Sequence, residues 1–107
     1  MPLSDSDNAL IRLRVFTDVQ SERFRQVHVE KFDAVHDDNH DAGELAKASA
    51  CYALHSAGGQ RTVQDLPMLW PWSACWWKPK SPRQDLVRAA ALLLAEIERL
   101  DRAEARK

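Results

Sequence analysis

The segment from residue 33 to residue 44 is the densest group of side chains that could perform chemistry. It holds five acidic residues and two histidines, with no lysine or arginine among them. Carboxylate and imidazole ligands together suit manganese, zinc, iron or nickel better than calcium. The segment therefore predicts a divalent metal ion, magnesium or manganese, held by the following residues: Asp37, Asp38, His40, Asp41 and Glu44.

The same segment has a second interpretation, which the sequence leaves open. Its spacing matches neither a zinc finger nor an EF-hand. Aspartates placed just before a helix accept hydrogen bonds from its first N–H groups and complement its dipole. Asp37, Asp38 and Asp41 would then cap a helix, and His36 and His40 would be ordinary surface or packing residues.

A second candidate site lies in residues 60–80, which contain all four tryptophans. A loop of this length is unusual in a compact domain unless it has a function. The indoles either plug the open end of a helical bundle, form an oligomer interface, or provide a platform on which a base stacks. In the stacking interpretation, the predicted ligand-binding residues are Arg23, Trp72, Trp76, Trp77, Lys78 and Lys80.

Polar residues around position 23 form a third group. On a helix, Glu22 reaches Arg25 and Gln26, which is a common surface arrangement. Arg23 falls on the apolar side of that helix, so its guanidinium needs a partner, either a carboxylate of the acidic segment or a bound phosphate. His28 and His55 have no obvious companions, and we predict no function for them.

The elements that must position these groups are helices. The first covers residues 17–32, and a capping-box pattern at Thr17 indicates its start. Residues 9–16 fit either a short strand or the early part of that helix, and we favour the helix. A second helix follows the acidic segment and ends at Gly58 and Gly59. Its apolar stripe consists of Leu45, Ala48, Ser49 and Tyr52.

The third predicted helix begins at Ser81 and Pro82 and continues to the C-terminus. Its apolar seam has the coiled-coil spacing of four, three, four and three residues, and Val87 and Leu94 widen this apolar face. Both an intramolecular bundle and a dimer would bury such a face, so the spacing does not choose between them. The members of the seam are Leu86, Ala90, Leu93, Ile97 and Leu100. The expected fold is all-α, a small bundle of three main helices with a Trp-rich loop between the second and third.

Composition limits the classes of function. The 107 residues, 45% of them hydrophobic, make one domain over 1–107, with residues 1–8 and 103–107 expected to fray. A net charge of −1 provides no global basic surface for nucleic acid. Two isolated cysteines indicate reduced thiols, and with no signal peptide or membrane-spanning run they favour a cytoplasmic protein. The sequence leaves open whether the protein forms a homo-oligomer through the third helix.

A set of short motifs runs through the chain from Thr17 to Arg102. The motifs are Glu22-Arg-x-Arg-Gln26, His36-Asp-Asp-x-His40, Gly43-Glu-Leu-Ala46, Trp70-Pro-Trp72, Trp76-Trp-Lys-Pro79 and Leu94-Ala-Glu-Ile-Glu-Arg-Leu-Asp-Arg102. Together they resemble a family of small phage and prophage proteins of unassigned function. That family is similar in turn to the MazG-like all-α nucleotide pyrophosphohydrolases, in which helix carboxylates bind magnesium beside a nucleoside triphosphate.

The second resemblance implies acidic pairs on two successive helices. The nearest matches are Asp41-x-x-Glu44 and, on the third helix, Asp85. His40 stands where that pattern usually has an acid, and the inward face of the third helix offers leucine and alanine. We therefore predict a phage-derived helical accessory protein that binds a host protein or a nucleotide. The alternative is a metal-dependent enzyme similar to nucleotide pyrophosphohydrolases.

Overall fold

The computed structural model describes residues 1–58 and 69–107. Over these residues the protein is all-α with no strand, as predicted, and its elements are α1 (Asp5–His28), α2 (Ala34–Asp38), α3 (Glu44–Ser56), the 3-10 helix η1 (Ala74–Trp76) and α4 (Pro82–Ala105). Gly59 and the first part of the predicted Trp-rich loop lie outside the described residues. No helix in the described ranges is long and apolar enough to cross a membrane.

Helix α1 is longer than predicted at its N-terminus. Ser4 caps it, and a capping box with Asp7 satisfies the first N–H groups. The start predicted at Thr17 is wrong, because Thr17 lies inside the helix and its hydroxyl donates to the Leu13 carbonyl. Residues 9–16 are therefore helical. Because α1 begins at Asp5 and α4 continues to Ala105, the non-helical ends are also shorter than expected.

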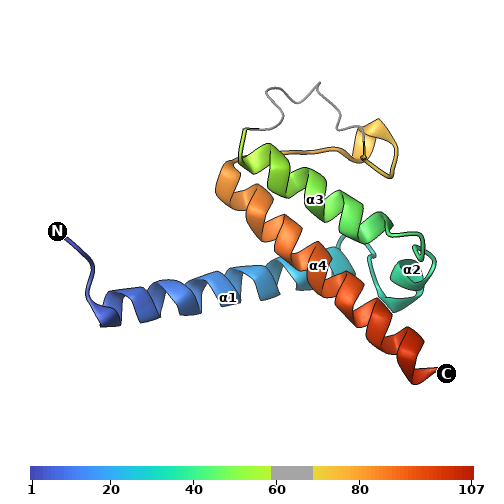
Figure 1. Cartoon of the computed structure of the whole chain (residues 1–107), viewed down its shortest axis with the longest axis horizontal. Coiled ribbons are helices and arrows are strands. Elements are labelled where there is room, and N and C mark those ends of the chain that lie inside the picture. Colours follow the sequence, from blue (N-terminus) through green and yellow to red (C-terminus); the bar gives the residue numbers. More distant parts are fainter. Residues whose placement is uncertain (59–68) are drawn as a thin grey trace.

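Helices α3 and α4 pack side by side and form the core (Figure 1). The stripe predicted on α3 is confirmed, since all four of its residues are buried. Small side chains on this face let α4 approach closely enough for the Ser49 hydroxyl to donate to the Ala89 carbonyl at 2.7 Å. The predicted start of α4 is confirmed too, because Ser81 is its N-cap and Pro82 its first residue.

The predicted seam of α4 does not face the core. The side buried against α3 consists of Asp85, Ala89, Ala91, Leu92 and Ala95, whereas the leucines and the isoleucine of the seam are about half exposed. Figure 1 shows α1 crossing α4, with the first half of α1 extending away from the other helices. Alanines face the small residues of α3 because they permit a closer approach than leucines.

The short helix α2 was not predicted, and charged residues of α4 hold it in place. Asp33 caps α2 by accepting from the His36 N–H. Asp38, at its end, accepts from Arg102 at 3.0 Å and from Arg106 at 2.7 Å. The last turns of α4 therefore anchor the acidic segment.

Candidate ligand-binding pocket

Two of the tryptophans close the core between α3 and α4. Trp70 and Trp77 are buried, and their ring centroids lie 5.6 Å and 4.7 Å from that of Tyr52. These two indoles plug the bundle, as one interpretation of the loop predicted. Trp77, predicted to bind a ligand, is therefore a core residue.

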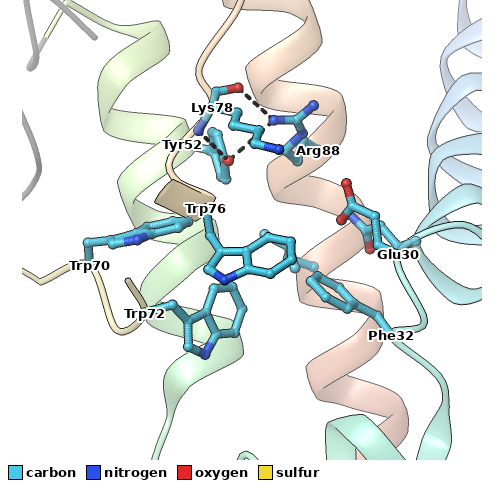
Figure 2. A pocket seen from close by; sticks show the side chains of 10 residues that line it. Glu30, Phe32, Tyr52, Trp70, Trp72, Trp76, Lys78 and Arg88 are labelled. Atoms are coloured by element: carbon cyan, nitrogen blue, oxygen red, sulfur yellow. Dashed lines mark hydrogen bonds between the residues drawn. The ribbon is translucent and has the colours of Figure 1, made fainter. Parts of the chain in front are cut away.

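The other two tryptophans line a pocket where the segment after α1 meets α3 and α4 (Figure 2). Trp72 and Trp76 stand beside Phe32, and Trp76 is about half exposed. The pocket is narrow, because its cavity volume of about 30 Å³ holds only a water molecule or two. Its lining consists of Gln26, Glu30, Phe32, Tyr52, Trp70, Trp72, Trp76, Lys78, Arg88 and Leu92.

A second hollow adjoins the pocket and shares part of its wall. It measures about 700 Å³ and is also lined by Glu30, Phe32, Trp72 and Trp76. On its far side it adds His36, His40 and Ser73. Phe32 stacks on His36 at 4.4 Å with an interplanar angle of 7°. Together the two hollows form an aromatic cleft with space on either side of Trp72 and Trp76.

Two buried polar atoms of this lining have no hydrogen-bond partner in the described part of the chain. Gln26 is 1% exposed, and its Nε2 donates to Glu22 at 3.3 Å. Its Oε1 accepts no hydrogen bond, and the Trp72 Nε1–H donates none. Buried polar groups are nearly always satisfied. Both atoms are sealed from solvent inside the wall, so they do not face the open part of the cleft.

The upper wall of the pocket is basic (Figure 2). Arg88 donates to the Tyr52 hydroxyl at 3.2 Å and to the Lys78 carbonyl at 2.7 Å. The Lys78 N–H donates to the same hydroxyl at 3.3 Å. The Lys78 ammonium lies 5.6 Å from the Trp76 ring centroid, a cation–π contact that leaves its N–H groups free to bind an anion.

Two other predicted ligand residues lie outside this pocket. Arg23 donates to Asp37 at 3.1 Å and to the Phe32 carbonyl at 3.1 Å, and it pairs with Glu98 at 2.8 Å. The prediction that Arg23 needs a carboxylate of the acidic segment is confirmed. Lys80 lines a separate hollow between α1 and α4.

Each of three carboxylates in the acidic segment has its own donors. Asp37 is fully buried against Arg23, and its Oδ1 lies 2.8 Å from the His36 ring. Hydrogen bonds from Arg102 and Arg106 hold the pKa of Asp38 below its ordinary value. Glu44 accepts from the Ala42 N–H at 2.7 Å and lies 3.1 Å from the His40 ring.

Asp41, the fourth carboxylate in the predicted metal set, is exposed. In the two ranges that the structure describes, no three His, Cys, Asp or Glu side chains are grouped so that they could hold one ion. Asp37 and Asp38 are committed to arginines, and Glu44 is committed to the Ala42 N–H and the His40 ring, so the segment does not fit the magnesium site that the resemblance implies. Metal binding stays a prediction from the sequence.

Several residues of the cleft escaped the sequence analysis. Phe32, Tyr52 and Arg88 carried no local signal, because three different elements bring them together. Gln26 had a partial signal in its spacing from Glu22. His55 was predicted to have no companion, but its Nδ1 lies 2.9 Å from the buried Asp85. That prediction is wrong, because the partner is far away in the sequence.

The pKa of Glu22 gives a pH-dependent prediction. Burial raises this pKa, but hydrogen bonds from Arg25 and Gln26 and the charges of Arg25 and Arg88 outweigh burial and keep it below the ordinary 4.5. A carboxyl whose pKa is lowered in the folded state stabilises the fold above its unfolded pKa, and the contribution is lost as the pH falls through the folded pKa. Glu22→Gln should therefore cost about 1.5 kcal/mol between pH 6 and 8.

Urea unfolding of the wild type and Glu22→Gln at several pH values checks this expectation. The difference in unfolding free energy should be constant from pH 8 to 6 and should shrink below about pH 4.5. A difference that stays the same down to pH 3 would contradict the role assigned to the ionised carboxylate.

Comparisons of the chain with protein-family models, curated proteins and solved structures found no match. The resemblance to a phage family and to the MazG-like enzymes therefore stays a prediction from the motifs. The cleft itself combines an aromatic lining with a basic upper wall.

Proposed function

We propose that this protein is a nucleotide-binding module, with the base bound in the cleft between Trp72, Trp76 and Phe32. Aromatic side chains from two segments line one cavity, which suits a flat ring that can stack. Stacking tolerates any base, since every base has a π-face. The aromatic lining therefore supports binding of the nucleotide class without selecting one member.

The observation that carries the proposal is the wider hollow beside Trp72 and Trp76, which is large enough for a small molecule. Its wall combines these two indoles with the rings of Phe32, His36 and His40. Aromatic rings are the surfaces on which a base stacks, so this lining suits a base better than a ligand without a flat ring.

The charge at the cleft supports a phosphorylated ligand. Lys78 is exposed at the upper wall, with its ammonium held over Trp76. Arg88 is fixed by Tyr52 and by the Lys78 carbonyl, so it adds positive potential without reorganisation. A phosphate attached to a stacked base can reach Lys78 directly. No metal ion and no bond cleavage form part of the proposal.

Isothermal titration calorimetry with ATP, GTP, CTP and UTP tests the proposal. We expect saturable binding of at least one nucleotide. Trp76→Ala should weaken it at least fivefold, because a base–aromatic stack contributes about 1–3 kcal/mol. Phe32→Ala should weaken it as well, because the Phe32 ring lines both hollows. Phe24→Ala, at an exposed position on α1 outside both hollows, is the matched control and should bind like the wild type.

Three results would overturn the proposal. One is the absence of binding for all four nucleotides at millimolar concentration, which would leave a host protein as the predicted partner. Another is binding that Phe32→Ala and Trp76→Ala leave unchanged while both variants melt like the wild type. The third is release of pyrophosphate from a bound triphosphate, which would establish the enzymatic alternative in place of a binding module.

A further inference from the structure

Helix α4 has an apolar side that no described element covers. One side packs on α3, and a second contacts α1. The third carries Leu86, Leu93, Ile97 and Leu100, each about half exposed. An exposed stripe of large aliphatic side chains along a helix of 24 residues is typical of an interface.

The first half of α1 extends this apolar surface. Leu10, Leu13 and Phe16 are each more than 60% exposed, and Gln26 is the one buried residue of the helix. A helical segment of about 12 residues is marginal in water without tertiary contacts. A groove lined by Val15 and Phe16 of α1 and by Ala90 and Leu94 of α4 joins the two helices into one face.

The size of this face fits a stable protein interface. The exposed parts of Leu10, Leu13, Phe16, Leu94 and the four stripe residues amount to roughly 800 Å² per copy, which is one side of a standard interface. A monomer rarely leaves a larger apolar patch than about 300–600 Å² uncovered. The face spans two helices, because α1 crosses α4 and its exposed first half continues beyond the crossing (Figure 1).

The order of residues along the stripe favours a second copy as the occupant. The stripe is almost symmetric about Leu93, so an antiparallel copy of α4 places Leu86 opposite Leu100 and brings the small Ala90 to within one residue of the large Ile97. The same register brings Arg83, which also pairs with Asp18 at 2.8 Å, near Glu104 of the second copy. A face that complements itself under a twofold rotation is the requirement for a symmetric dimer.

We propose that the protein forms a twofold homodimer. In it the α4 helices of two copies pack antiparallel about Leu93, and the exposed first half of each α1 adds apolar surface beside this contact. This dimer is a separate proposal from nucleotide binding and does not depend on it. The stripe lies on the side of α4 that faces away from α3, whereas the cleft lies where α3 and α4 meet.

Sedimentation equilibrium of the full chain tests the dimer. The wild type should have twice the chain mass of 12.2 kDa at micromolar concentration, and Leu93→Glu should have the mass of one chain. Leu54→Glu, at a position of similar exposure on α3, is the matched control and should stay dimeric. A monomeric wild type overturns the proposal and leaves the face to a different protein, and a Leu93→Glu variant that stays dimeric overturns it as well.

Disulfide trapping covers the case in which Leu93→Glu fails to fold. In a Cys75→Ser background, Leu93→Cys should cross-link nearly completely under mild oxidation, because residue 93 of one copy meets residue 93 of the other. Leu54→Cys should not cross-link. Equal cross-linking of the two variants overturns the antiparallel register.

Discussion

Leu45→Ala is expected to lower the free energy of unfolding by about 3 kcal/mol, the range typical for removing a fully buried leucine side chain. Leu45 is completely buried in the cluster formed by α3, α4 and the inner tryptophans. Leu54→Ala, on the same helix but 59% exposed, should cost less than about 0.5 kcal/mol.

Urea unfolding of both variants at one protein concentration measures the two effects. The comparison is matched, since the residue type and the helix are the same and the burial differs. Equal losses in the two variants would contradict the packing of α3 against α4 that forms the floor of the cleft.

Asp37→Asn is expected to destabilise the fold by about 3 kcal/mol. Removing one partner of a buried ion pair leaves the other charge uncompensated, at a cost of about 3–5 kcal/mol. We expect the lower end because Arg23 keeps its contact with Glu98. Asp41→Asn is the control, as Asp41 is exposed and makes no ion pair among the described residues, and it should change stability by less than about 0.5 kcal/mol.

The same pair of variants distinguishes the ion-pair role of Asp37 seen in the structure from the metal site predicted from the sequence. If Asp37 stabilises the fold by pairing with Arg23, Asp37→Asn lowers the melting temperature by the same amount with and without manganese. If the segment holds a metal, manganese raises the melting temperature of the chelator-stripped wild type, and both variants lose that rise. The second outcome would contradict the ion-pair role and support the metal site predicted from the sequence.

Local patterns predicted the helices well because caps and periodicity act within a few residues. Ser81 and Pro82 marked the start of α4, and the stripe on α3 identified its buried side. Local patterns could not identify which of the two apolar sides of α4 packs on α3. The choice depended on the small residues of α3, which favour an alanine-lined contact and leave Leu93 on the outer face.

The cleft was predicted in part. Trp72, Trp76 and Lys78 were assigned to a ligand site from their types and their proximity in the sequence, and all three line the pocket. Trp77 looked the same in sequence, but burial against Tyr52 sets it apart. The Gln26 amide could not be assigned, because whether it is satisfied depends on contacts that form only in the folded chain.

The most direct test of the proposed function follows the indole N–H signals of the protein by NMR during a nucleotide titration. We predict a large, saturable shift of the Trp72 signal, because the Trp72 ring lines both hollows and a base stacked beside it changes its surroundings. The Trp77 signal should barely move, since Trp77 is buried outside the pocket lining. A Trp72 signal that stays fixed while nucleotide binds, or that moves no more than the Trp77 signal, would contradict the assignment of this cleft as the nucleotide site.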